Sequence, residues 1–364
     1  MALSVGIVGL PNVGKSTVFN ALTAGKAEAA NYPFCTIDPN VGVVPVPDAR
    51  LKRIESHIKT QKVIPAIVEI VDIAGLVKGA SQGEGLGNKF LANIRETNAV
   101  LMMVRCFDDP NVIHVSGSVD PMRDIDIIDL ELALADVETA EKRVKKAQGA
   151  AKTGSKEGKI ELALAEKVFN HLQAGKAARS LQLSDDEKKQ VATFGLLTAK
   201  PVLYCCNVGE ADLPAGNQWS DAVKERAKKE GAGVVILCGK VEAELAELGE
   251  ADRVELLKSY GLEEPALSSL ARECYRLLGL QSYFTAGEKE VRAWTIRKGA
   301  LAPEAAGVIH TDFEKGFIRA QVYGLADLDQ FGSEAGIKAA GKLRMEGKEY
   351  VVQDGDIMHF LFNV

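Results

Sequence analysis

Short apolar runs recur along the first 280 residues and alternate with amphipathic stretches. The runs are continuous and mainly aliphatic or β-branched, which is typical of strands in a parallel sheet covered on both faces. They lie at residues 3–8, 41–46, 67–71, 100–104, 202–206 and 234–237. Helix-compatible segments between them include residues 16–24, 88–97 and 219–230. This pattern predicts a doubly wound α/β domain with a mainly parallel sheet.

Roughly a hundred residues separate the predicted strands 100–104 and 202–206, although one crossover helix needs far fewer. Two amphipathic patterns, 125–147 and 158–175, fill this gap around a polar turn. Their apolar positions with helical spacing are Leu130, Leu134, Val137, Val144 and Ala147 in the first and Ile160, Leu164, Val168 and Leu172 in the second. The sequence therefore predicts an inserted antiparallel helical hairpin, an arm whose longer helix extends about 35 Å.

The pattern changes near residue 280, after helical segments over residues 254–278. Short strand candidates, glycine-rich turns and one brief helix at 302–309 follow. The strand candidates lie at residues 293–296, 317–322, 349–352 and 357–362. The last 84 residues therefore predict a separate small α+β domain.

A glycine-rich loop follows the first predicted strand directly. Residues 9–16 read Gly-Leu-Pro-Asn-Val-Gly-Lys-Ser, which matches G-x-x-x-x-G-K-[ST] between a strand and a helix. Its glycines let backbone N–H groups converge on phosphate oxygens, and Lys15 brings a positive charge to the β- and γ-phosphates. Ser16 offers a hydroxyl to Mg²⁺. The motif predicts a nucleoside triphosphate site; position, spacing and flanks argue against a chance glycine-rich turn.

Two further segments favour a nucleotide switch among the many classes that share this loop. Asp72 and Gly75 close the run 67–71 with D-x-x-G, where the carboxylate can hold Mg²⁺ through water and the Gly75 N–H can contact a γ-phosphate. Thr36 lies between a loop and a strand, where its hydroxyl can complete the Mg²⁺ shell only in the triphosphate state. Thr36 taken alone is better explained as a surface-turn residue; the order and spacing of the motifs favour the switch.

Asn207-Val208-Gly209-Glu210 follows the predicted strand 202–206. Guanine-specific switch proteins carry N-K-x-D at this point, and their Asp accepts hydrogen bonds from the guanine ring N–H and amino group. With Val208 and Glu210 in these places, guanine selectivity is expected to weaken and adenine becomes an alternative. The second base-contacting segment is Cys238-Gly239-Lys240. An Asn helix cap with a surface Glu is the other explanation of residues 207–210.

Leu76 follows Gly75, where many switch GTPases have the Gln that orients the attacking water. A Leu cannot orient water, so hydrolysis is either slow and dependent on a partner or assisted by another polar group. His114 is one candidate, with a purely structural role as the alternative; a His114→Ala variant with intact turnover would exclude the catalytic role. Asn12 is a candidate ligand for a monovalent cation such as K⁺.

The composition is that of an ordinary globular chain, with 364 residues, 46% hydrophobic and 26% charged, and predicts two or three domains. Apolar runs of about 18 residues are absent from the sequence, and its start lacks signal-peptide features, so we expect neither a transmembrane helix nor a secretory leader. The six cysteines show no C-x-x-C pair. This favours reduced, buried thiols in a cytosolic protein over disulfides or a zinc site.

The net charge of −6 argues against a nucleic-acid partner, but the charge is unevenly distributed. Residues 142–179 carry ten basic and three acidic side chains, a net charge of +7. We expect this arm to bind a polyanion, with an affinity that falls as salt rises, although a solvated helix face is the alternative. The candidate nucleic-acid patch comprises Lys142, Arg143, Lys145, Lys146, Lys152, Lys156 and Lys159.

With these motifs, the sequence resembles the YchF subfamily of Obg-related, translation-factor-class P-loop NTPases. The resemblance rests on GLPNVGKST at 9–17, NYPFCTIDPNVG at 31–42, DIAGLVKGASQGEGLG at 72–87 and NVGE at 207–210. It covers the full length. The segment AGVIHTDFEKGFIRA at 306–320 is similar to that of a TGS domain, which has a β-grasp, ubiquitin-like fold.

The resemblance implies a cytosolic, Mg²⁺-dependent ATPase of low intrinsic activity that tolerates GTP, associates with ribosomes, chiefly the large subunit, and is linked to stress responses. It implies that Ser16 and Thr36 hold Mg²⁺, that Asp72 does so through water and that Asn207 reads the base. The implied phosphate ligands are Asn12, Val13, Gly14, Lys15, Ser16 and Thr17. The expected domains are a nucleotide-binding domain (1–128 and 201–280), the arm (129–200) and a TGS domain (281–364).

The main hypothesis is therefore a nucleotide-switched, ribosome-associated ATPase that hydrolyses the β–γ phosphoanhydride bond. Its nucleotide state positions the arm and the TGS domain on RNA or ribosomal protein. A GTPase of the Obg type is the alternative within the class, and competition between ATP and GTP distinguishes the two. A nonenzymatic RNA- or protein-binding module that only senses nucleotide is the alternative from another class.

Overall fold

The computed structural model describes residues 3–24, 40–73, 86–152 and 155–363. It consists of two compact units, residues 1–43 with 69–270 and residues 44–68 with 271–364. The second unit includes residues 44–68, a segment that the sequence analysis assigns to the nucleotide-binding domain. The domain limits given above remain predictions.

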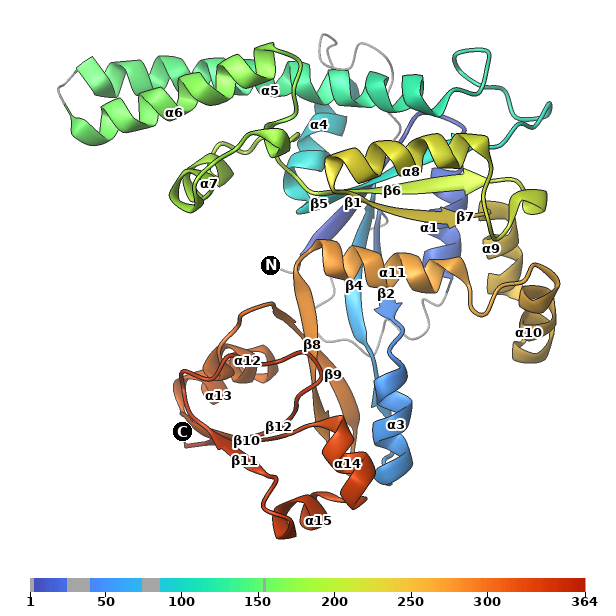
Figure 1. The fold of residues 1–364 in the computed structure, drawn as a ribbon, viewed down its shortest axis with the longest axis vertical. Helices are drawn as coiled ribbons and strands as arrows, with labels where there is room; N and C mark the ends of the chain where they lie inside the picture. The colour runs from blue at the N-terminus through green and yellow to red at the C-terminus, as the bar shows by residue number, and fades with distance from the viewer. Residues whose placement is uncertain (1–2, 25–39, 74–85, 153–154, 364) are drawn as a thin grey trace. The chain divides into compact units, whose positions relative to one another are not determined.

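A sheet of six strands in the described part of the chain has the order β2-β4-β1-β5-β6-β7 (Figure 1). The strands are β1 (Ser4–Val8), β2 (Val41–Val46), β4 (Ala66–Asp72), β5 (Ala99–Cys106), β6 (Val202–Val208) and β7 (Gly233–Leu237). The pairs β1–β4, β1–β5, β5–β6 and β6–β7 are parallel. Every residue of β1, β5 and β6 is buried, as the continuous apolar runs predict. The predicted α/β fold class is confirmed.

Several helices of the first unit lie outside the inserted arm. They are α1 (Lys15–Thr23), α4 (Leu86–Glu96), α8 (Gln218–Glu230), α9 (Gly239–Glu247), α10 (Glu250–Ser259) and α11 (Ala266–Leu277), which continues into the second unit. Helix α8 packs on β6 and β7, and α9 packs against α1. The contact between α9 and α1 brings the start of α9 close to the glycine-rich loop.

The predicted arm consists of α5 (Pro121–Lys152) and α6 (Lys156–Gln173), which pack side by side (Figure 1). The 3₁₀-helix η1 (Ala178–Ser180) and α7 (Asp185–Ala192) lead back to β6. Side chains from α5, α6 and the returning segment share one apolar core: Ala140, Leu164, Ala165, Val168, Leu172, Ala178, Val191, Phe194 and Leu196. The α5 helix is longer than predicted, about 48 Å at about 1.5 Å per residue.

The predicted apolar stripe of α5 is wrong in its first half. Leu130 is 58% exposed and Leu134 is 39% exposed, whereas Ile128 and Leu132 are buried. The reason is a change of partner along the helix. Asp126 and Asp129 in its first half bind Arg226 of α8, whereas Val137, Ala140 and Val144 further along pack with side chains of α6. The two partners lie against different faces of one helix, so a single stripe cannot describe both.

The second unit contains a sheet of six described strands in the order β11-β10-β12-β8-β9-β3. These are β3 (Val63–Ile64), β8 (Leu280–Ala286), β9 (Val291–Arg297), β10 (Phe317–Tyr323), β11 (Arg344–Glu346) and β12 (Ile357–Phe362). Its helices are α3 (Ala49–His57), α12 (Ala302–Ile309), α13 (Thr311–Lys315), α14 (Leu325–Phe331) and α15 (Glu334–Ala339). The predicted α+β character of the C-terminal part is confirmed.

The strand predicted at 349–352 is wrong, because Val351 forms only an isolated bridge with Leu301. Its neighbour Val352 donates its backbone N–H to the Ala300 carbonyl, so this segment follows the turn before α12 rather than the sheet. In the described residues, the free cysteines 106, 205, 206, 238 and 274 are all buried, and Cys35 lies outside the described residues. Among the helices described, none combines the length and apolar character needed to cross a membrane.

Candidate nucleotide site

The glycine-rich loop connects β1 to α1 and contains two left-handed residues, Asn12 with φ 62° and Gly14 with φ 97°. Gly14 is required on two counts. Its φ disfavours an L side chain, and a Cβ at this position would lie 2.3 Å from Asn207 Nδ2. The loop therefore curls tightly against the end of β6, with the first turn of α1 directly after it.

Lys15 is buried inside this loop. Its Nζ donates hydrogen bonds to the carbonyl oxygens of Gly9 and Leu10, each at 3.0 Å. Burial lowers the pKa of Lys15, and the charge of Asp72 opposes this shift. Burial likewise raises the pKa of Asp72, opposed by the charge of Lys15. Each charge therefore favours the ionised form of the other at the point where the loop meets the end of β4.

The oxygen donors expected to hold Mg²⁺ are partly described. Ser16 and Thr17 are exposed on the first turn of α1, and Asp72 is half-buried at the end of β4. Hydroxyl and carboxylate oxygens are ligands that Mg²⁺ prefers, so this donor set fits the ion. Thr36, Gly75 and Leu76 lie outside the described residues.

Asn207 joins three segments that are distant in the sequence. Its Nδ2 donates to the Val13 carbonyl at 2.9 Å, and its Oδ1 accepts from the Gly239 N–H at 2.9 Å. The side chain is buried at the end of β6. It thus fixes the glycine-rich loop relative to the start of α9, which places the two predicted base-contacting segments side by side.

Glu210, in the short 3₁₀-helix η2 (Glu210–Asp212), is engaged by two neighbours. Its Oε1 lies 2.6 Å from Lys240 Nζ, and its Oε2 accepts from Tyr260 Oη at 3.3 Å. The hydrogen bond from Lys240 is the main cause of the lowered pKa of Glu210. Tyr260 was not singled out from the sequence, since nothing in its sequence context connects it to this site. Val208 is buried within β6 and faces the core rather than solvent.

His114 is buried and bonded through both ring nitrogens. Its Nε2 lies 2.9 Å from Asp124 Oδ2, and its Nδ1 accepts from the Ser116 N–H at 3.0 Å. The preceding residue contacts the glycine-rich loop, because Asn12 Nδ2 donates to the Ile113 carbonyl at 3.2 Å. The structure therefore brings the His114 loop to the nucleotide site, and the catalytic role of the ring remains a prediction.

Arg105 is a site residue that sequence reasoning missed. It is buried at the end of β5, and its Nε and Nη2 donate to the carbonyls of Phe107 (3.1 Å) and Val112 (2.9 Å). The guanidinium therefore shapes the loop that leads to His114. The sequence does contain a signal, because Arg105 is a charged residue at the end of an otherwise apolar run.

Six of the seven basic side chains predicted to bind nucleic acid are exposed: Lys142, Lys145, Lys146, Lys152, Lys156 and Lys159. Arg143 differs from them. Its Nη2 donates to Thr193 Oγ1 at 2.8 Å, and its guanidinium lies 4.7 Å from the centre of the Phe194 ring. Arg143 therefore fastens the returning segment to α5 and contributes less to the surface patch.

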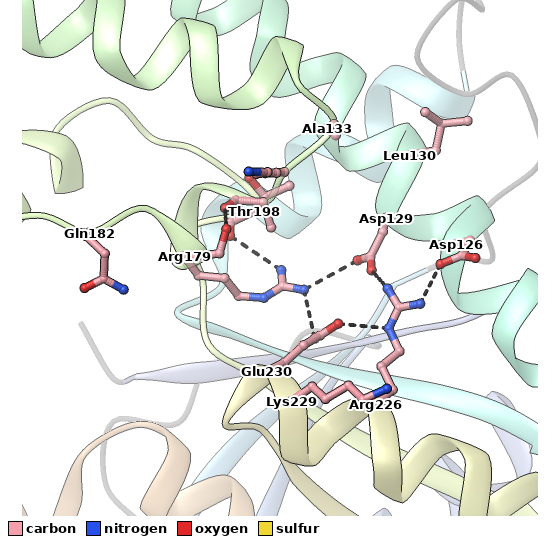
Figure 2. A pocket seen from close by; sticks show the side chains of 14 residues that line it. Asp126, Asp129, Leu130, Ala133, Arg179, Gln182, Thr198, Arg226, Lys229 and Glu230 are labelled. Carbon is pink, nitrogen blue, oxygen red and sulfur yellow. Dashed lines mark hydrogen bonds and ion pairs between the residues drawn. The ribbon is translucent and has the colours of Figure 1, made fainter.

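A cavity of about 780 Å³ lies at the root of the arm, between α5, η1 and α8 (Figure 2). Arg226 of α8 forms ion pairs with Asp126 and Asp129 of α5 and with Glu230 of its own helix. Arg179 makes longer contacts to Asp129 (3.7 Å) and Glu230 (3.4 Å) (Figure 2). These ion pairs connect the arm to the domain that carries the nucleotide site.

Known proteins match this chain over its full length. A family model described as "50S ribosome-binding GTPase" matches residues 4–146, and the YchF C-terminal model, described as "Protein of unknown function (DUF933)", matches residues 280–363. Proteins named "Ribosome-binding ATPase YchF" are 55% identical in Haemophilus influenzae and 52% identical in Bacillus subtilis, with complete coverage of both chains.

A solved structure agrees with these sequence matches. The structure of the Schizosaccharomyces pombe YchF GTPase has a TM-score of 0.89 and 41% identity, and the match covers 99% of this chain and 97% of that one. The fold and the resemblance predicted from the sequence are thus both confirmed. Since identity, coverage and fold agree from end to end, this chain belongs to the YchF family of P-loop nucleoside triphosphatases.

Proposed function

We propose that this protein is a nucleotide-switched ATPase that slowly hydrolyses ATP with Mg²⁺, tolerates GTP and binds the ribosome, chiefly its large subunit, in the cytoplasm. The observation that carries the proposal is the position of Asn207, which joins the Val13 carbonyl to the Gly239 N–H beside the buried Lys15. The names of the relatives, ribosome-binding ATPases, support the ribosome and ATP as partners.

Different residues bind the phosphates, bind the metal ion and orient the attacking water. The loop backbone and Lys15 bind the β- and γ-phosphates. Ser16 and Thr36 would hold Mg²⁺ directly and Asp72 through water, and the ion would neutralise charge on the phosphates. In the reaction a water oxygen bonds to the γ-phosphorus while the bond to the β-phosphate oxygen breaks, and the water protons pass to phosphate and solvent. His114 orients this water in place of the Gln of other switch GTPases, whose position is occupied here by Leu76.

We expect ATP to bind more tightly than GTP, by about 1–2 kcal/mol or roughly 5- to 30-fold. The carboxylate of Glu210 is already bonded to Lys240 and Tyr260, so guanine donors placed there would have to share it with these partners or displace them. Displacement of a fluorescent ATP analogue by unlabelled ATP and GTP measures the ratio. Equal displacement, or tighter GTP binding, would identify an Obg-type GTPase instead.

The exposed lysines of the arm supply the contact with ribosomal RNA. We expect a Lys142→Ala/Lys146→Ala/Lys159→Ala variant to bind purified large subunits more weakly. The slope of log binding constant against log salt concentration should become shallower by about 2–3. Cosedimentation between 50 and 200 mM salt, roughly the range where such slopes are steep, measures both effects.

The matched control removes the same charge outside the basic patch of residues 142–159. Lys188, Lys189 and Lys228 are also exposed, on α7 and α8, and their replacement by Ala is expected to leave the slope near the wild-type value. If both triple variants lose the same affinity, the net charge of the protein rather than the arm patch determines binding, and the arm proposal fails.

A further inference from the structure

The cavity at the root of the arm has the size of a small-molecule site. Its volume of about 780 Å³ lies within the range of about 300–1,000 Å³ that such sites occupy. Its walls come from α5, from the returning segment around η1 and from α8 (Figure 2). The described part of this lining includes no residue of the nucleotide site. The cavity can therefore hold a ligand other than the nucleotide.

Two arginines face this cavity, and they differ in how they are bonded (Figure 2). Arg226 contacts three carboxylates at 2.5–2.9 Å, distances typical of strong charge-assisted hydrogen bonds. The guanidinium of Arg179 has only longer contacts among the described residues. They are to Asp129 (3.7 Å), Glu230 (3.4 Å) and the Thr198 carbonyl (3.5 Å). Since hydrogen bonds weaken beyond about 3.2 Å, Arg226 is fully bonded and Arg179 is not.

The guanidinium of Arg179 is nevertheless largely removed from water. Its side chain is 19% exposed, and its Nε has no hydrogen-bond partner in the described part of the chain. The backbone N–H of Arg179 donates to the Thr198 carbonyl at 3.1 Å, which fixes the main chain at this point. A charge withdrawn from water costs free energy unless short hydrogen bonds compensate it. A ligand anion in the cavity would supply the acceptor that this side chain lacks.

The charges around the cavity favour a ligand with one negative charge. Lys176 and Lys229 also line the cavity, and both are exposed and have no ion-pair partner among the residues described. The described lining contains four basic and three acidic side chains, a net charge of +1. A phosphomonoester carries about −1.5 to −2 at neutral pH and exceeds this charge, whereas a carboxylate matches it.

The cavity also has an apolar wall, formed by Leu130 and Ala133 of α5. Leu130 has the helical spacing of a core residue, yet it is 58% exposed. The phosphodiester groups of RNA carry one negative charge each, but the sugars beside them offer little apolar surface to cover Leu130. A carboxylate attached to an aliphatic body meets both requirements, because it combines one negative charge with apolar surface that water disfavours.

We propose that this cavity binds a ligand that carries one carboxylate on an aliphatic body. The carboxylate accepts hydrogen bonds from Arg179, with Lys176 and Lys229 adding positive charge, and the aliphatic body covers Leu130. Two sources share this chemistry: a free organic acid, and the carboxyl terminus of a peptide that ends in an aliphatic residue. Because Lys176 and Arg179 lie in the returning segment and Lys229 lies in α8, the bound ligand connects these segments and stabilises the root of the arm.

The test is calorimetric titration of the full chain with 4-methylpentanoate, with Mg²⁺ and ADP at saturation so that the nucleotide site is filled. We expect a Kd of about 0.1–1 mM, in keeping with a ligand of so few atoms. The amide of the same acid has the same shape without the charge and should bind at least about tenfold more weakly. Hydrogen exchange of the amides of residues 178–182 should slow when the acid binds.

Variants locate the binding within the cavity. Arg179→Gln is expected to lower the affinity for the acid at least about tenfold, because it removes a charge-assisted hydrogen bond. Leu130→Ala should lower it about threefold while the affinity for acetate stays unchanged, since acetate has no aliphatic body to lose contact. Lys188→Gln, on the exposed surface of α7, is the matched control and should bind the acid as the wild type does. If Arg179→Gln does not fold, the exposed pair Lys176→Gln/Lys229→Gln should show a loss of about three- to tenfold.

A second titration distinguishes the two sources. If N-acetyl-Gly-Leu binds more tightly than 4-methylpentanoate and its amidated form does not bind, the ligand is a peptide terminus. If the free acid binds more tightly, the ligand is a small organic acid; both results support the proposal.

Three results would overturn it. One is equal binding of the acid and its amide, which would mean that no charge is recognised. Another is wild-type affinity in Arg179→Gln, or in the double lysine variant if that is the one that folds. The third is displacement of the acid by inorganic phosphate at equal concentration, which would identify a general anion site in which the apolar wall has no part.

Discussion

A Lys15→Met variant is expected to lose about 10²–10³-fold in ATP hydrolysis while keeping its fold. The ammonium group meets the β- and γ-phosphates where negative charge develops, and removal of one such donor typically costs this much in kcat. Met has a similar length and volume, so the loop keeps its packing. Single-turnover measurement of phosphate release at saturating Mg²⁺ and ATP measures the loss.

Two opposing effects keep the stability of this variant close to that of the wild type. Burial lowers the pKa of Lys15, so the folded state disfavours the ammonium, and its removal is favourable. The hydrogen bonds to the Gly9 and Leu10 carbonyls are lost at the same time. We expect the free energy of unfolding to change by about 1 kcal/mol or less.

Lys188→Met, on the exposed surface of α7, is the matched control and should hydrolyse ATP at the wild-type rate. The same variants address the role of hydrolysis in the cell. If Lys15→Met abolishes hydrolysis but leaves every cellular effect of the protein intact, the chain acts as a nonenzymatic binding module that only senses nucleotide, and the ATPase proposal does not describe its function.

We expect an Asp136→Ala variant to lower the free energy of unfolding of the arm by about 3–4 kcal/mol, the largest stability effect predicted here. The carboxylate is fully buried and accepts hydrogen bonds from the Leu197 N–H, the Thr198 N–H and the Thr198 hydroxyl, at 2.6–2.8 Å. Its removal leaves three buried donors without an acceptor. Hydrogen exchange of the amides of residues 197 and 198 reports the loss locally.

The exchange measurement also provides the contrast that decides the prediction. Asp185→Ala, at the exposed start of α7, is expected to change the free energy of opening measured at the same amides by less than about 0.5 kcal/mol. Asp136→Asn, which keeps one acceptor oxygen, should fall between the two. If Asp136→Ala and Asp185→Ala gave equal protection at residues 197 and 198, the carboxylate would not be what holds the returning segment to α5.

The parts of this fold that could be predicted are those where one local pattern has one structural consequence. The continuous apolar runs predict the parallel strands, since each strand of that sheet is covered on both faces. The loop with Gly14 and Lys15 predicts the turn between β1 and α1, because a phosphate-binding backbone leaves little freedom in sequence. Asn207 was predicted to lie at the base-contacting segment, and the structure brings it to Val13 and Gly239.

The features that escaped prediction depend on which residue meets which across long sequence separations. Leu130 has the spacing of a core residue, but its exposure follows from the position of α8, about a hundred residues further along the chain. The bond of Tyr260 to Glu210 is of the same kind, and the bond of His114 to Asp124 depends on where α5 begins. Spacing within a segment carries no information about such partners.

The change of packing partner along α5 limits how the arm can vary in length. Consecutive helical residues are rotated by about 100°, so one residue inserted between Ala135 and Ala140 would turn the distal face away from α6 and advance it by about 1.5 Å. The lysines beyond that point would rotate with it, whereas Asp124 and its bond to His114 would not. Extra turns added equally to α5 and α6 at their far ends preserve both faces. The arm can therefore lengthen at its tip, while its root admits neither an added nor a missing residue.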